Sequence, residues 1–256
     1  MVVAHSLNEE IERKRYKISN EPKYFLKRSQ RIKRYLKEVG NVYSFWLEHP
    51  ELRERLLAEN GVRDGKQLRH EAIGGVGRIE EAWRYLHNVG ESSNFISSLT
   101  PDLIKEIGMK VEPFVKGFRD SRVSLGFDKY TPPNPVKVPD LIDKLCNDLK
   151  NSDYSHVEVA AVAHLNIAGI QPFVNGNKRT ARLIQDRILE DYGLPPAVIP
   201  SGERIVYLDL LEEGLVGIRD NKLDMQRPFF DYIAGKVNTA LDEILNDLFS
   251  DSHKKY

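Results

Sequence analysis

The sequence predicts a mainly α-helical protein that carries one small β element. Along most of its 256 residues, apolar side chains recur every three or four positions, which is the spacing of a helix that buries one face. The segment 117–130 differs, because its apolar residues alternate with polar ones as in a strand. No stretch is rich enough in proline, glycine or serine to mark a firm linker. We divide the chain into a helical N-terminal region, residues 1–95, and a core, residues 96–256.

The composition excludes several classes of protein. Lysine plus arginine and aspartate plus glutamate both number 38, so the overall charge selects no anionic partner, and any preference for phosphate or nucleic acid has to be local. The single cysteine, Cys146, excludes an internal disulfide and a multi-cysteine metal site, and its apolar neighbours predict a buried structural thiol. No apolar run reaches the length of a signal peptide or a membrane span, so we expect a soluble, cytoplasmic protein. The sequence does not indicate an oligomeric state.

The N-terminal region is predicted to contain three helices. Residues 1–22 before them are polar and are expected to be loosely helical at most. Lys23–Lys37 places seven cations among apolar residues at helical spacing, which predicts an amphipathic basic helix. Such a helix either presents a solvated charged face or grips nucleic-acid phosphates. The next two predicted helices are Val42–Asn60 and His70–Asn88.

The helix at His70–Asn88 has an unusual first half. Gly74, Gly75 and Gly77 lie there. A glycine inside a helix costs about 1 kcal/mol relative to alanine, so this cluster predicts close approach by another segment.

The core is predicted to hold helices on both sides of the alternating segment. Thr100 and Pro101 open the first one in the expected way, as a cap residue followed by proline at the first helical position. Within 117–130, Val123, Leu125 and Phe127 alternate with polar residues, which predicts that part of this segment is a strand, and the prolines that follow force an extended exit. The predicted core helices are 100–115, 140–150, 155–170, 178–192, 203–214 and 227–249.

The two central helices of the core are joined by a loop whose predicted geometry is suited to binding an anion. Pro172 ends the first helix, because its ring removes a backbone donor and restricts the residue before it. The loop 174–177 contains a glycine and feeds the N-terminus of the second helix, where unpaired N–H groups and the positive end of the dipole meet. Lys178, Arg179 and Arg182 all follow in the first turns, where the dipole disfavours cations. We therefore expect a polyphosphate here.

The loop resembles the signature of the Fic family, whose usual form is His-Pro-Phe-x-(Asp/Glu)-Gly-Asn-Gly-Arg-x-x-Arg. Gln171 stands where the family has histidine, Asn175 where it has the acid, and Lys178 where it has the second glycine. An ordinary helix–turn–helix with basic residues is the alternative explanation of the pattern. The positions that match the signature are Pro172, Phe173, Gly176, Asn177, Arg179 and Arg182.

The resemblance implies a fold and a reaction. The fold is a Fic-type helical core with a small β-hairpin flap at 117–130, to which this chain adds its N-terminal helices. The reaction is the transfer of AMP from ATP, with Mg²⁺, to a hydroxyl of a target protein that pairs with the flap through its main chain. By the same resemblance, Gln171 is at the catalytic position and Asn175 at the metal position. The residues implied to bind the nucleotide are Gly176, Asn177, Lys178, Arg179 and Arg182.

The departures from the signature weaken the chemical half of the site. Gln171 accepts no proton in the useful pH range, and losing a general base removes about 10²–10⁴-fold of rate. Asn175 is a neutral ligand where Mg²⁺ prefers a carboxylate. His164 lies two helical turns, about 10 Å, before Gln171 and is interpreted as a core histidine instead of a substitute base. The sequence Asn177-Lys178-Arg179 also resembles that of the death-on-curing toxins, which are Fic relatives that act as kinases. The group that is transferred therefore stays open between AMP, phosphate and another group.

Many Fic proteins also carry an inhibitory helix of the form (Ser/Thr)-x-x-x-Glu-(Gly/Asn), often with isoleucine before the glutamate. Ile79-Glu80 resembles its core, although Val76 and Glu81 replace the flanking residues of the pattern. This interpretation predicts that the 70–88 helix inhibits the site by pairing Glu80 with Arg182. The alternative is that Glu80 is a solvated helix residue.

Three functions follow from these patterns. The first is an adenylyltransferase-like protein whose activity is weak or altered by Gln171. The second is a catalytically inactive, nucleotide-binding Fic pseudoenzyme. The third is a nucleic-acid-binding regulator that uses the Lys23–Lys37 helix.

Overall fold

The computed structural model describes residues 3–21, 41–51, 64–89 and 94–250. These residues form α-helices, two short 3₁₀ helices and connecting segments, with no β-strand among them. The predicted mainly helical fold is therefore confirmed, and the basic helix predicted at Lys23–Lys37 lies outside the described residues. The α-helices are α1 (His5–Ser19), α3 (Asn41–Glu48), α5 (Asp64–Asn88), α6 (Phe95–Ser98), α7 (Pro101–Val111), α8 (Val138–Lys150), α9 (His156–Ile170), α10 (Asn177–Asp191), α11 (Arg204–Arg219) and α12 (Leu223–Ser250), and the 3₁₀ helices are η2 (Pro135–Lys137) and η3 (Ser201–Glu203).

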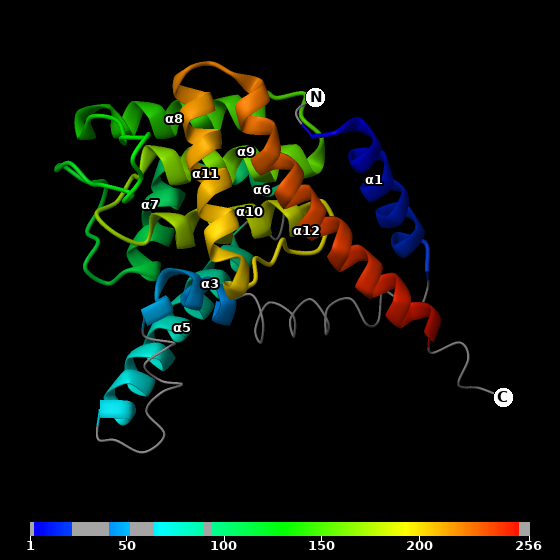
Figure 1. The fold of residues 1–256 in the computed structure, drawn as a ribbon, viewed down its shortest axis with the longest axis horizontal. Helices are drawn as coiled ribbons and strands as arrows, with labels where there is room; N and C mark the ends of the chain where they lie inside the picture. The colour runs from blue at the N-terminus through cyan, green and yellow to red at the C-terminus, as the bar shows by residue number, and fades with distance from the viewer. Residues whose placement is uncertain (1–2, 22–40, 52–63, 90–93, 251–256) are drawn as a thin grey trace.

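Helix α9 lies at the centre of the core. It is apolar on every side, as a helix surrounded by others must be, and it packs against α8, α10, α11 and α12. Figure 1 shows α9 and α10 in the middle of the molecule, while α5 extends away from this core. Helix α10 packs against α9, and its buried face includes Arg179 and Arg182.

Local signals in the sequence fix where several of these helices begin. The hydroxyl oxygen of Thr100 accepts a hydrogen bond from the N–H of Leu103 at 3.2 Å, and Pro101 is the first residue of α7, as predicted. The carboxylate of Glu158 accepts hydrogen bonds from the N–H of Ser155 at 2.8 Å and from the N–H of Val3 at 2.7 Å. The second contact ties the start of the described chain to the central helix.

The N-terminal segment is more ordered than its composition suggests. Residues 5–19 form α1, which packs along α12 and buries Ile11 and Ile18. Two apolar residues seven positions apart lie on one face of a helix, which is enough to attach α1 to a neighbour.

Helix α3 packs against α5 at the predicted glycine cluster. A Cβ atom built on Gly75 would lie 2.0 Å from Cε2 of Phe45, so any larger residue at this position would collide with the ring. The predicted close approach is therefore confirmed at Gly75. The approaching segment is α3, and its position matters for the site described below.

The predicted β-hairpin at 117–130 is wrong. The segment is irregular and contains several bends, and Val123, Leu125 and Phe127 are half-buried while the residues between them are exposed. It is attached to the core by other contacts. The side chain of Arg119 donates to the backbone oxygens of Gln171 at 2.6 Å and Pro133 at 2.7 Å. The alternation therefore indicates that one face of this irregular segment is covered, and the segment pairs with no strand among the described residues.

Among the described helices, none combines the length and the hydrophobicity that crossing a bilayer requires.

Candidate phosphate-binding site

The loop between α9 and α10 is held in a fixed shape by its own polar groups. Gln171 ends α9 in the left-handed region at φ 49°, and Gly176 precedes α10 at φ 80°. The side chain of Asn177 ties the loop together: its oxygen accepts from the N–H of Phe173 at 2.8 Å, and its amide nitrogen donates to the Phe173 carbonyl at 2.8 Å. The ring of Phe173 is completely buried against α7, where a Cβ on Gly108 would lie 2.3 Å from it.

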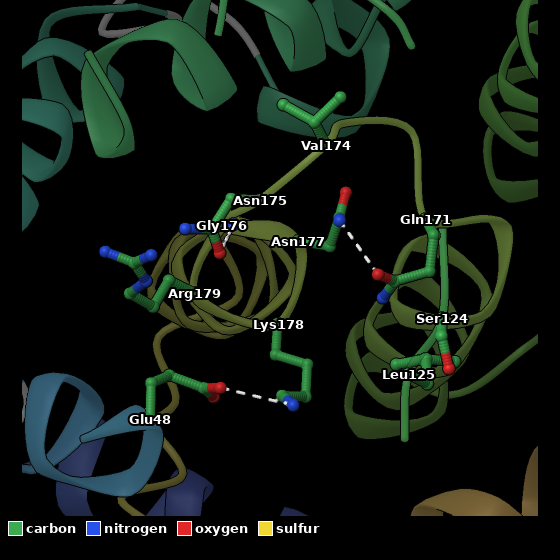
Figure 2. Close-up of a pocket in the computed structure, with 10 residues that line it drawn as sticks. All are labelled: Glu48, Ser124, Leu125, Gln171, Val174, Asn175, Gly176, Asn177, Lys178 and Arg179. Carbon is green, nitrogen blue, oxygen red and sulfur yellow. Dashed lines mark hydrogen bonds and ion pairs between the residues drawn. The ribbon is translucent and has the colours of Figure 1, made fainter. Parts of the chain in front are cut away.

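The N-terminus of α10 opens into a cavity of about 120 Å³ (Figure 2). The N–H groups of Asn177 and Lys178 belong to the first turn, where a helix offers no internal acceptor. This volume suits a phosphate group better than a whole nucleotide, for which pockets of roughly 300–1,000 Å³ are typical. The cavity is lined by Glu48, Ser124, Leu125, Gln171, Val174, Asn175, Gly176, Asn177, Lys178 and Arg179.

Glu48, the last residue of α3, forms ion pairs with two of the three cations at the start of α10, Lys178 and Arg182. Its Oε1 lies 3.0 Å from Nη2 of Arg182, and its Oε2 lies 3.2 Å from Nζ of Lys178. Burial raises the pKa of Glu48, but the charges of Arg182 and Lys178 outweigh burial and lower this pKa to about 2. Ser44, one turn earlier, accepts two further hydrogen bonds from Arg182, one at its hydroxyl oxygen and one at its carbonyl oxygen, both at 3.0 Å.

Glu112 holds the third cation from the other side. It follows α7, and its Oε2 lies 3.0 Å from Nη2 of Arg179. The same oxygen accepts a hydrogen bond from the side-chain amide of Asn175 at 3.1 Å. Two carboxylates from separate helices therefore balance three cations at the start of α10.

Comparison with known proteins identifies this part of the chain. Residues 92–189 match the model of the Fic/DOC family. The chain belongs to the Fic/DOC family. It is 32% identical over 215 residues to protein adenylyltransferase fic-1 of Caenorhabditis elegans, a match that covers 75% of this chain and 39% of that protein. It is 35% identical over 137 residues to protein adenylyltransferase Fic of Drosophila willistoni, covering 52% of this chain and 26% of that protein. The chain thus spans less than half the length of these relatives.

Solved Fic structures share the fold. A segment of Fic-1 from Caenorhabditis elegans superposes with a TM-score of 0.71 at 20% identity, covering 96% of this chain and 72% of that one. A Fic domain-containing signaling protein from Bacteroides thetaiotaomicron gives a TM-score of 0.69 at 19% identity, covering 94% of this chain and 96% of that one. At these identities the likeness concerns the fold alone.

The predicted pair of Glu80 with Arg182 is wrong. The carboxylate at Arg182 belongs to Glu48, while Glu80 lies half-buried on α5. The reason is the packing of α3 against Gly75, which places α3 at the cations. The signal for Glu48 was present in the sequence: Ser44-Phe45-Trp46-Leu47-Glu48 has the serine and glutamate of the Fic inhibitory pattern at the right spacing, with His49 in place of Gly/Asn.

Gln171 is buried, and both ends of its amide are bound within the loop. Its nitrogen donates to the carbonyl of Ala168 at 2.7 Å, and its oxygen accepts from the amide of Asn177 at 2.9 Å. These contacts fix the orientation of the amide, and an amide cannot act as a general base. Where Fic proteins have their histidine, this chain has a group that braces the loop.

Asn175 does not fit a resident Mg²⁺ ion. Its oxygen accepts the N–H of Gly176 at 2.7 Å, and its nitrogen donates to Glu112. Mg²⁺ bound by protein prefers carboxylate oxygens. The described residues also contain no group of three or more histidine, cysteine, aspartate or glutamate side chains arranged to hold a metal.

His164 is a core residue, as its position on α9 predicted. It is completely buried between Gln185 and Tyr207, with its two ring nitrogens 2.7 Å and 3.0 Å from their side-chain oxygens. Burial lowers the pKa of His164 to about 3, so the ring is neutral. Both nitrogens are engaged in the interior, so His164 does not replace the missing base.

Proposed function

We propose that the chain is a Fic-type protein adenylyltransferase that binds ATP at the N-terminus of α10 and transfers AMP slowly to a protein hydroxyl. The observation that carries the proposal is the group of three cations, Lys178, Arg179 and Arg182, which meet at one helix N-terminus and are balanced by carboxylates from outside the loop. The names of the relatives at 30–35% identity support the same reaction class.

Arg179 has a hydrogen-bond donor that a phosphate of ATP could use. Arg179 uses one nitrogen for Glu112, and its Nε is buried with no hydrogen-bond partner. A buried unpaired N–H costs about 1–3 kcal/mol, and a phosphate oxygen would remove that cost. The planar guanidinium can therefore bind phosphate without leaving Glu112.

Glu48 makes the observed state self-inhibited. Its carboxylate takes the place of a phosphate at Arg182 and Lys178, and the remaining cavity is small. For a complete triphosphate to bind, Glu48 has to withdraw, and the phosphate then replaces it as the partner of Arg182. This substitution keeps both cations paired in each state.

The transfer itself forms one bond and breaks another. The hydroxyl oxygen of the target attacks the α-phosphorus of ATP, the bond from that phosphorus to the bridging oxygen breaks, and pyrophosphate leaves. The proton of the hydroxyl then passes to water or a phosphate oxygen, since Gln171 accepts none. We expect a rate about 10²–10⁴-fold below that of a site with a base. Any Mg²⁺ would arrive on the phosphates of the nucleotide.

The segment 117–130 is the proposed docking site for the target protein. It lies beside the cavity, because Ser124 and Leu125 line it together with Gln171 (Figure 2). Its stretch 122–125 contains no bend and pairs with no strand among the described residues, so its backbone can pair with an extended segment of a target. A target bound there would present its hydroxyl near the α-phosphate.

One observation favours a second function, that of a nucleotide-binding pseudoenzyme. Both atoms of the Gln171 amide are bound inside the loop, so this residue neither accepts a proton nor readily turns toward a substrate hydroxyl. In this case ATP binding itself, through displacement of Glu48, would be the function.

Labelling of cell lysate with ATP separates the two functions. The proteins to compare are the wild type, Glu48→Gly, Gln171→His and the double variant, each with α-labelled and γ-labelled ATP. The adenylyltransferase predicts weak α-label transfer by Glu48→Gly and much stronger transfer by the double variant. A pseudoenzyme predicts none without Gln171→His. Transfer of γ-label would indicate a kinase, and failure of Glu48→Gly to bind ATP would refute both functions.

A further inference from the structure

Behind Arg182, a line of buried polar side chains crosses the core from α10 to α11, to α9 and back to α10. Nη1 of Arg182 lies 3.4 Å from the hydroxyl oxygen of Tyr207, and that oxygen lies 3.0 Å from Nε2 of His164. Nδ1 of His164 lies 2.7 Å from Oε1 of Gln185, whose Nε2 lies 3.0 Å from a carboxylate oxygen of Asp186. Tyr207, His164 and Gln185 are each at most 1% exposed.

The hydrogen bonds in this line all point the same way. Burial raises the pKa of Asp186 to about 6, so the group is a carboxylate at neutral pH and accepts; the amide nitrogen of Gln185 donates to it and the amide oxygen faces His164. That oxygen accepts from Nδ1 of His164, which therefore carries the ring proton. Because burial lowers the pKa of His164 to about 3, the ring is neutral and Nε2 is an acceptor.

The direction continues to the arginine. Burial raises the pKa of Tyr207 to about 12, so its hydroxyl keeps its proton and donates it to Nε2 of His164. The hydroxyl oxygen is left to accept from Arg182, which can only donate. At the other end, Asp186 also accepts the N–H of Ala197 at 3.1 Å. The chain thus begins at the signature arginine and ends on a fixed carboxylate.

We propose that Tyr207 is a positioning residue that keeps Arg182 directed at the phosphate site when Glu48 withdraws. The other side-chain and backbone oxygens that Arg182 contacts, at Ser44 and Glu48, both belong to α3. If α3 moves as a unit, both are lost together. Tyr207 belongs to α11 in the core, and its own hydroxyl is fixed by His164.

The inference rests on the proposed nucleotide site, and Tyr207→Phe tests it in a Glu48→Gly background. The substitution removes the hydroxyl but keeps the ring, over which the Arg182 guanidinium lies at 5.8 Å. We expect affinity for ATP to fall about tenfold, the usual size of one hydrogen bond to a charged group. Affinity for AMP, which lacks the terminal phosphates, should change much less. A purely structural role would weaken both nucleotides equally.

Tyr232→Phe is the matched control, because it removes a hydroxyl that donates to Glu203 at 2.8 Å and not to the line described here. It should leave the ratio of ATP to AMP affinity unchanged. An unchanged ratio in Tyr207→Phe, or an equal loss for both nucleotides, would overturn the proposal. Failure of Glu48→Gly itself to bind either nucleotide would instead refute the proposed function.

A second measurement does not depend on nucleotide. Nitrogen chemical shifts of His164 in the full chain report which ring nitrogen carries the proton. We expect Nδ1 to be protonated and Nε2 to be an acceptor whose shift moves in Tyr207→Phe. A proton on Nε2 would reverse the direction of the chain, and His164 would then no longer fix the Tyr207 hydroxyl with its oxygen facing Arg182, which would refute the positioning role even if no variant bound ATP.

Discussion

The two carboxylates at the start of α10 hold their cations in different ways. Glu112 lies inside the segment that matches the Fic/DOC model, and a Cβ on Gly176 would be only 3.3 Å from the Cβ of Glu112. Glu48 lies outside that segment, on α3. Glu112 uses a single oxygen for Arg179 and Asn175, whereas Glu48 spreads its two oxygens over Arg182 and Lys178.

This difference indicates two roles. Among the described residues, Glu112 is the one hydrogen-bond acceptor of Arg179, so it orients a cation that would otherwise be buried alone. Arg182 has an acceptor outside α3, the hydroxyl oxygen of Tyr207, in addition to Glu48 and Ser44, so it keeps a partner when the carboxylate leaves. Glu112 is therefore a permanent part of the loop, and Glu48 is a removable occupant of the phosphate site.

The largest expected effect is the loss of stability in Glu112→Gln. Removing one partner of a buried ion pair costs about 3–5 kcal/mol, since the other charge stays buried and unpaired. Glu48→Gln should cost less, about 2–3 kcal/mol, because Arg182 keeps its other acceptors. Urea unfolding of both variants measures the difference.

Glu81→Gln serves as the control for the stability comparison. Its pair with Lys110, at 3.8 Å, is 65% exposed on the glutamate side, so it should contribute less than about 1 kcal/mol. If Glu48→Gln proved as destabilising as Glu112→Gln, the distinction between an orienting and a removable carboxylate would be lost.

Acid should weaken the Glu48 contact selectively. The pKa of Glu48 is lowered from 4.5 to about 2, so its stabilising contribution is present above pH 4.5 and is lost as the pH falls toward 2. Between pH 6 and pH 3 the loss should be about 2 kcal/mol by this linkage. The measurement is the difference in unfolding free energy between wild type and Glu48→Gln at each pH. A difference that stays constant over this range would show that Glu48 is not held by these cations.

Much of the fold could be predicted because its signals are local. The start of α7 follows from Thr100 and Pro101, and the end of α9 follows from Pro172. The signature loop was predicted from Gly176 and the cations after it. These are features of a few neighbouring residues, and they do not depend on which other helix lies nearby.

The missed features are all contacts between distant segments. The sequence identified the glycines of α5 as a place of close approach, but it did not reveal that Phe45 fills this place and that α3 brings Glu48 with it. The alternation in 117–130 predicted one covered face correctly, whereas pairing into a hairpin depends on a partner strand that the described residues do not supply. Glu112 carries no motif, and only the packing of α7 against the loop places it at Arg179.

Removing the side chain of Glu48 should make the phosphate site available to ATP. We expect Glu48→Gly to bind ATP about tenfold more tightly than wild type, because one charged competitor for Arg182 and Lys178 is removed. Glu51→Gly makes the same change of charge just beyond α3, at an exposed residue, and should leave the affinity unchanged. Calorimetry at two salt concentrations measures both. Equal affinities in wild type and Glu48→Gly would contradict the assignment of Glu48 as the occupant.

The smallest expected effect is that of Asn175→Asp. It tests whether the role of Glu112 is limited to orienting Arg179. Asn175→Asp restores the acid of the Fic signature, but it replaces the amide that donates to Glu112 at 3.1 Å by a second carboxylate. Without metal, the two negative groups repel, and we expect a loss of stability on the order of 1 kcal/mol. Magnesium with ATP should recover that loss in the variant and have little such effect on wild type, because a divalent cation would balance the added negative charge. Thermal unfolding with and without Mg²⁺ and ATP measures the effect, and Asn151→Asp, at an exposed position after α8, controls for the change of charge. If Asn175→Asp were destabilised equally with and without Mg²⁺ and ATP, the added carboxylate would not hold a cation, and Glu112 would be left with Arg179 as its sole charged partner.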